Sequence, residues 1–125
     1  MKYFILISSV FISVLSYGQV EFRTVSGCSI DDYVVADTIS SIAFSGGSYT
    51  PKCLKILIGS EVTVSASKRH PLFSQGVNPL NPITATETTK SFEFNDPGFF
   101  GYFCDKHGDA SGSGMAGSIW VVESL

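Results

Sequence analysis

The chain has 125 residues, of which 44% are hydrophobic and 15% are charged, and its formal net charge is −3. This length is sufficient for one small domain. The acidic balance argues against a nucleic-acid partner, because nucleic-acid binding requires a basic surface.

The N-terminal segment differs in composition from the rest of the chain. Lys2 is followed by a mostly apolar run over 3–15 and then by small and turn-forming residues. This order is typical of a secretory signal peptide, so we expect a signal over 1–18 and a domain over 19–125. A membrane anchor is the alternative, but the apolar run is shorter than the ~20 residues that a spanning helix needs. We therefore expect export to the periplasm or the cell exterior, without a membrane anchor.

After the signal, the pattern is that of short strands separated by turns. Runs rich in Val, Ile, Thr, Phe and Tyr alternate with Gly, Pro, Asn and Asp, and no helical period is sustained. Strands are predicted at 38–44, 54–58, 61–66, 89–94, 99–104 and 117–122. The Gly59-Ser60 pair is either a tight hairpin or a turn that passes the chain to a second sheet. The segments 71–86 and 108–114, rich in Pro and Gly respectively, predict loops. We expect a single all-β domain, a Greek-key β-sandwich of about seven to eight strands.

Three cysteines follow the predicted signal, an odd number for a protein in an oxidising compartment. Cys104 lies close to His107 and Met115, which suggests another role for its thiol. Cys28 and Cys53 are therefore the expected disulfide pair. The alternative is that both are buried free thiols.

Four potential metal ligands stand out in the chain. Cys104, His107 and Met115 lie within one short C-terminal stretch, and His70 lies upstream. Two imidazoles, one thiolate and one thioether form the ligand set of a mononuclear blue-copper site. Each residue also has an ordinary interpretation, since a cysteine or methionine can simply fill a core and a histidine can lie on the surface. The combination predicts one copper ion that alternates between Cu(I) and Cu(II).

The segments around these residues resemble the cupredoxins. The block 97–107, followed by 114–121, is similar to the copper loop of that family, with plastocyanin and pseudoazurin nearest in spacing. The upstream segments 49–56 and 70–72 also resemble plastocyanin-like secreted bacterial proteins. The resemblance covers about residues 24–123.

The resemblance implies a type 1 blue-copper protein that carries single electrons. Redox-partner proteins would dock transiently near His107 and His70, and the chain would act as a monomer. The acidic net charge permits docking to a basic redox partner. Copper enzymes of this lineage need further copper centres, and this chain has no spare histidines, so we do not expect an enzyme.

Two departures from the family pattern keep other functions open. Seven residues separate His107 from Met115, where the family usually has two to four, and Arg69 replaces the asparagine that often precedes the first histidine. The cysteines, in contrast, follow the family pattern. The family pairs a cysteine at the Cys53 position with one near the N-terminus, which fits Cys28. The main alternative is a copper chaperone or buffer of the cell envelope. A further alternative is a binding module that has kept the sandwich and lost the metal.

Overall fold

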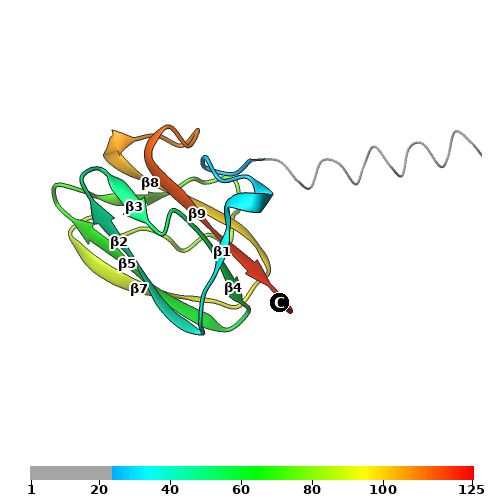
Figure 1. Cartoon of the computed structure of the whole chain (residues 1–125). Helices are drawn as coiled ribbons and strands as arrows, with labels where there is room; N and C mark the ends of the chain where they lie inside the picture. The colour runs from blue at the N-terminus through cyan, green and yellow to red at the C-terminus, as the bar shows by residue number, and fades with distance from the viewer. Residues whose placement is uncertain (1–23) are drawn as a thin grey trace, which may run out of the picture.

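The computed structural model describes residues 24–125, which form a sandwich of two β-sheets (Figure 1). The strands of the first sheet are, in spatial order, β1 (Val34–Val35), β4 (Cys53–Leu57), β9 (Gly114–Val122), β8 (Gly98–Gly108) and β6 (Leu72–Ser74). The strands of the second sheet are β3 (Ser48–Thr50), β2 (Ile39–Ser45), β5 (Ser60–Ser67) and β7 (Thr88–Phe94). The expected all-β sandwich is confirmed, and the predicted signal peptide, 1–18, lies outside the described residues.

Most connections pass from one sheet to the other, and only β2–β3 and β8–β9 join neighbouring strands of the same sheet. β4 belongs to the first sheet and β5 to the second, so Gly59-Ser60 passes the chain between sheets and does not form a hairpin within one sheet. Gly59 has a φ of +87°, a conformation that glycine adopts without steric cost. Strands distant in sequence become neighbours in this way, with β9 parallel to β4 and β5 parallel to β2.

The hydrophobic core lies between the inward faces of the sheets. Every second side chain of β5 is buried, which is the period expected for a strand with one face on a core. Phe92 and Phe94 of β7 are both buried, as their spacing predicts. The fully buried side chains of this core include Ile42, Leu54, Ile56, Val62, Val64, Leu72, Tyr102, Cys104, Met115 and Ile119. The sulfur atoms of Cys104 and Met115 are therefore part of the packed interior.

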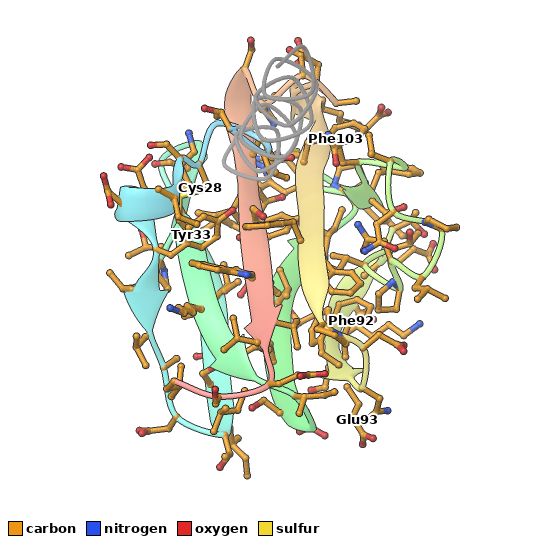
Figure 2. All side chains as sticks on the ribbon, turned by 90° about the vertical axis from the view of Figure 1, so that its right-hand side faces the viewer. Cys28, Tyr33, Phe92, Glu93 and Phe103 are labelled. Atoms are coloured by element: carbon orange, nitrogen blue, oxygen red, sulfur yellow. A yellow bond between two sulfur atoms is a disulfide. The ribbon has the colours of Figure 1, made fainter. Side chains whose placement is uncertain are left out.

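Aromatic side chains join the 3₁₀ turn η2 (Ile30–Asp32) and β1 to the first sheet. Tyr33 packs edge-on against Trp120, with ring centroids 5.5 Å apart, and its hydroxyl bonds the Ser118 hydroxyl at 3.0 Å. Phe99 stacks on Trp120 at 5.1 Å, and the Lys55 ammonium lies 4.3 Å from the Trp120 centroid. Figure 2 shows Tyr33 close to Cys28, on the β1 side of the sheet. Packing, together with the disulfide between Cys28 and Cys53, thus fixes the N-terminal part of the domain.

The predicted disulfide between Cys28 and Cys53 is present, with Cα atoms 5.8 Å apart. It attaches the turn Val25–Cys28 to the beginning of β4. Backbone hydrogen bonds in both directions, each 2.8 Å long, close this turn between Val25 and Cys28. Cys104 is a free, buried cysteine.

The structure corrects several element boundaries. Residues 24–125 form nine strands, and the additional ones are short: β1 has two residues, and β3 and β6 have three each. β6 lies inside 71–86, where a loop is predicted, because strand pairing with β8 outweighs the local signal of the prolines. The loop predicted at 108–114 is shortened to 109–113, since β8 extends to Gly108 and β9 begins at Gly114. The described residues include no helix with the length and apolar character needed to cross a bilayer.

Removing the disulfide should measurably destabilise the domain. The bridge joins cysteines 25 positions apart, and the chain-entropy model assigns about 3 kcal/mol to a loop of this size. We expect a Cys28→Ala/Cys53→Ala variant to unfold with a free energy lower by about that amount. Urea denaturation of the copper-free protein measures the difference. Adding reductant should destabilise the wild type but not the variant, and equal stability of the two proteins would contradict a structural role for the bridge.

Candidate metal centre

Cys104 lies on the inward face of β8, at the end of the sandwich where β8 pairs with β6. Its side chain is completely buried, whereas the preceding Phe103 points to the other face and is partly exposed. Figure 2 shows Phe103 on β8 near one end of the sandwich. In the β6–β8 ladder, Cys104 is the direct partner of Leu72. This register places the thiol beside the segment that carries His70, although the two residues are 34 positions apart in sequence.

His70 ends the tight turn that follows β5. Ser67 and His70 exchange backbone hydrogen bonds of 3.1–3.2 Å, and the Ser67 hydroxyl also accepts from the His70 amide at 3.1 Å. The imidazole packs against the Phe44 ring of β2, with centroids 4.5 Å apart. The turn and this aromatic contact hold the imidazole over the end of the core.

His107 follows Cys104 by three residues, on the last part of β8. The β8–β9 register shifts between Phe103 and Gly108, so this stretch departs from regular pairing. The irregularity lets Cys104 and His107 face the same point, although strict alternation would place residues three apart on opposite faces. The His107 and His70 rings are 4.7 Å apart, and His107 is exposed to solvent.

The three donors converge closely. The Cys104 Sγ lies 3.5 Å from the Nδ1 of His107 and 3.8 Å from the Nδ1 of His70, and ligand atoms of all three residues lie within 4.8 Å of one another. Three N and S donors arranged in a plane around one transition-metal ion, with bonds of about 2.0–2.3 Å, are separated by about 3.6–3.8 Å. The two sulfur–nitrogen distances therefore fit a shared ion.

The electrostatic surroundings favour the neutral form of His70. Desolvation lowers the pKa of its imidazole, and electrostatic repulsion from the neighbouring His107, Arg69 and Lys106 side chains lowers this pKa further. The neutral imidazole is the form that binds a metal ion.

Met115 lies near the beginning of β9, fully buried in the same core cluster as Cys104. Gly108 of β8 is paired with Gly114, the residue before Met115. A Cβ atom on Gly108 would collide with the Met115 backbone, so glycine at 108 permits this close approach. The hairpin thus returns the thioether-bearing residue to the end of β8 despite the long connection.

Comparison with known proteins depends on structure, because no family model and no curated protein matches the sequence. A copper-containing nitrite reductase from Thermus scotoductus is 18% identical, with a TM-score of 0.56 over 78% of this chain. A pseudoazurin from Sinorhizobium is 19% identical, with a TM-score of 0.52 over 70% of this chain and 76% of its own. An oxidised point mutant of amicyanin is 20% identical, with a TM-score of 0.50 over 70% of this chain and 85% of its own.

The chain has the cupredoxin fold. Pseudoazurin and amicyanin match this fold over most of their own length, whereas this chain spans only 29% of the nitrite reductase. The resemblance inferred from the sequence is thus confirmed at the level of the fold.

A backbone hydrogen bond connects the segments that carry His70 and Cys104. The Asp105 amide donates to the Pro71 carbonyl at 3.1 Å, next to His70 on one side and Cys104 on the other. Arg69, which occupies the position of the usual asparagine, is exposed and has no part in this connection. The main chain therefore links the segments without the missing amide side chain.

The long segment between His107 and Met115 is a compact, internally bonded loop. The Asp109 carboxylate accepts from the Ser111 hydroxyl at 2.5 Å and from the backbone amides of Ser111 and Ser113 at 3.0 and 3.3 Å. These hydrogen bonds lower the pKa of Asp109. The Asp109 amide also donates to the Ser113 carbonyl at 3.1 Å, which closes the loop across its base.

The tip of this loop contacts the N-terminal turn that the disulfide anchors. Gly112 has a φ of +97°, and a Cβ atom there would collide with the backbone of Ser26 and Gly27. The Ser26 side chain in turn is buried close to Gly101 of β8. The N-terminal turn Val25–Cys28 thus packs between β8 and the loop 109–113. No motif in the sequence indicates this contact.

Replacing Gly112 should disturb the loop more than an equivalent change elsewhere. Gly47 is a matched control, because its φ is +91° and a Cβ atom there would meet nothing within 4 Å. We expect Gly47→Ala to cost about 1–2 kcal/mol from backbone strain alone. Gly112→Ala should cost about 1–3 kcal/mol more, because it also overpacks the contact with the N-terminal turn. Thermal or urea unfolding measures both variants, and equal losses would show that the contact is unimportant.

Proposed function

We propose that this cupredoxin binds one copper ion through His70, Cys104 and His107, with Met115 as a weak axial ligand. The observation that carries the proposal is the convergence of the Cys104 thiol and two imidazole nitrogens, at 3.5 and 3.8 Å, at the end of the core. A trigonal His₂Cys set with a weak thioether is the donor set of blue-copper sites. The match of these distances to a shared ion supports the assignment.

We further propose that the site transfers single electrons. Copper, when bound, supplies the Cu(I)/Cu(II) couple. The donors stand on strands and bonded turns, so the ligand geometry changes little between the two states, which favours rapid transfer. The exposed edge of His107 offers a route toward a partner docked near His107 and His70.

An exported location agrees with the covalent structure. The disulfide between Cys28 and Cys53 favours an oxidising compartment, either the periplasm or the cell exterior. We propose that residues 1–18 direct this export and that the mature chain acts as a monomer.

The absorption spectrum tests the copper proposal directly. The copper(II)-loaded wild type should show an intense visible charge-transfer band from the Cys104 thiolate, and voltammetry should show a reversible one-electron couple. Cys104→Ser should abolish the band and most of the copper affinity, because serine offers no thiolate. A colourless copper(II) complex of the wild type, or a Cys104→Ser variant that keeps the band, would contradict the proposal.

Met115→Leu tests the axial position separately. Leucine has a similar volume but no sulfur, so the variant should fold, bind copper and have a raised reduction potential. Ile119→Leu is the control, since Ile119 is equally buried on β9 but outside the donor group. Voltammetry of both variants decides the matter: an unchanged potential in Met115→Leu would place the axial donor elsewhere.

A copper-transfer or buffering role is the second candidate, favoured by the exposure of His107. An exposed ligand gives a competing copper-binding protein direct access to the ion. Transfer would appear as rapid loss of Cu(I) to a competing chelator without a reversible couple at an electrode. Slow loss together with a reversible couple would support the electron carrier.

A further inference from the structure

A buried tyrosine lies beside the candidate copper centre without a hydrogen-bond partner among the described residues. Tyr49 belongs to β3 and is 3% exposed, and its side chain packs into the core cluster that contains Cys104 and Met115. Within residues 24–125, its buried hydroxyl oxygen has no hydrogen-bond partner. A buried hydroxyl without a partner is destabilising, so its retention calls for an explanation.

Two neighbours of Tyr49, Phe44 and Tyr102, connect it to the candidate site. In the β2–β3 ladder it is directly opposite Phe44, whose ring packs on His70 at 4.5 Å. Its own ring meets the Tyr102 ring edge-on, with centroids 5.0 Å apart. Tyr102 precedes Cys104 by two residues, so both point to the same face of β8. Tyr49 therefore neighbours both Phe44, which packs on His70, and Tyr102, which lies two residues before Cys104.

The Tyr49 phenol stays protonated in this environment. Burial raises its pKa, and the negative charge of an ionised Cys104 raises it further. A protonated phenol has one hydrogen to donate, and a metal-bound cysteine is a thiolate that can accept it.

The Tyr49 hydroxyl makes no hydrogen bond to Cys104 in the described structure. We propose that it donates to the Cys104 sulfur once copper binding converts the thiol into a thiolate, and that Tyr49 acts as a positioning residue that sets the electronic properties of the sulfur. Hydrogen bonding around the cysteine sulfur is one of the factors that tune the potential of a blue-copper site. The donor stabilises the electron-rich sulfur of the Cu(I) form more than that of the Cu(II) form. Tyr49 should therefore raise the reduction potential. This inference rests on the proposed copper-binding function.

The variant Tyr49→Phe removes the hydroxyl and keeps the ring. In the copper-loaded protein, we expect a lower reduction potential by voltammetry and a shift of the thiolate charge-transfer band to longer wavelength. In the copper-free protein, we expect a higher Tm, because an unpaired buried hydroxyl is removed. The increase in Tm that copper produces should become smaller than in the wild type. This opposite effect on the two forms is the signature of a partner that exists only when the metal is bound.

Tyr102→Phe is the matched control on the neighbouring ring. The Tyr102 hydroxyl already donates to the Lys52 carbonyl at 3.4 Å, so its loss should lower the Tm of both forms alike and leave the potential and the band unchanged. A blue wild type whose Tyr49→Phe variant has the same potential and band would overturn the role of Tyr49 and leave the copper assignment intact. A wild type that binds no copper would overturn the proposed function itself, and this inference with it.

Discussion

The pairing of β6 with β8 is the constraint on which the candidate centre depends. His70 and Cys104 are 34 positions apart, and they meet because Leu72 is aligned with Cys104 and the Asp105 amide bonds the Pro71 carbonyl. β6 is only three residues long, yet its pairing with β8 gives this part of the predicted loop a defined register. A shift of one residue in this register would turn the Cys104 side chain away from the core. The donor geometry is therefore a consequence of main-chain hydrogen bonds as much as of the side chains themselves.

Burial protects the Cys104 thiol from oxidation and from disulfide exchange, so that it stays available to bind a metal ion. Cys104 is completely enclosed, whereas Cys28 and Cys53 are already joined to each other. The imidazoles differ in exposure, because His70 is partly covered by Phe44 and His107 faces solvent. The sulfur is thus enclosed, whereas the His107 imidazole is accessible at the surface where the proposed redox partner would dock. On the core side, Cys104 shares one cluster of buried residues with Tyr49 and Met115.

The sequence was sufficient to predict the longer strands, the disulfide and the group of potential metal ligands. It was not sufficient to predict the shortest strands or the contacts between residues distant in the chain. Alternation of apolar and polar residues predicts β5 and β7. The odd number of cysteines, with Cys104 assigned to another role, predicts the disulfide between Cys28 and Cys53. The grouping of His70, Cys104 and His107 followed from the residue types that one metal prefers. Strands of two or three residues carry no measurable period, so β1, β3 and β6 could not be found. The packing of Phe44 on His70 and of Tyr49 on Tyr102 involves a hairpin far away in sequence, which only tertiary packing brings close to the site.

The loop between His107 and Met115 bears on which function the fold can perform. A connection of this length would normally loosen two donors, because a longer loop has more conformations to restrict. Here three features remove that freedom: the Gly108–Gly114 pair at the base, the hydrogen bonds to Asp109 within the loop, and the contact of Gly112 with the N-terminal turn. The disulfide in turn fixes the position of that turn. A loop restrained from inside and outside would keep His107 and Met115 in one arrangement if the charge of a bound ion changed. Rigid donors suit an electron carrier, whereas a protein that hands over its metal benefits from donors that can move apart.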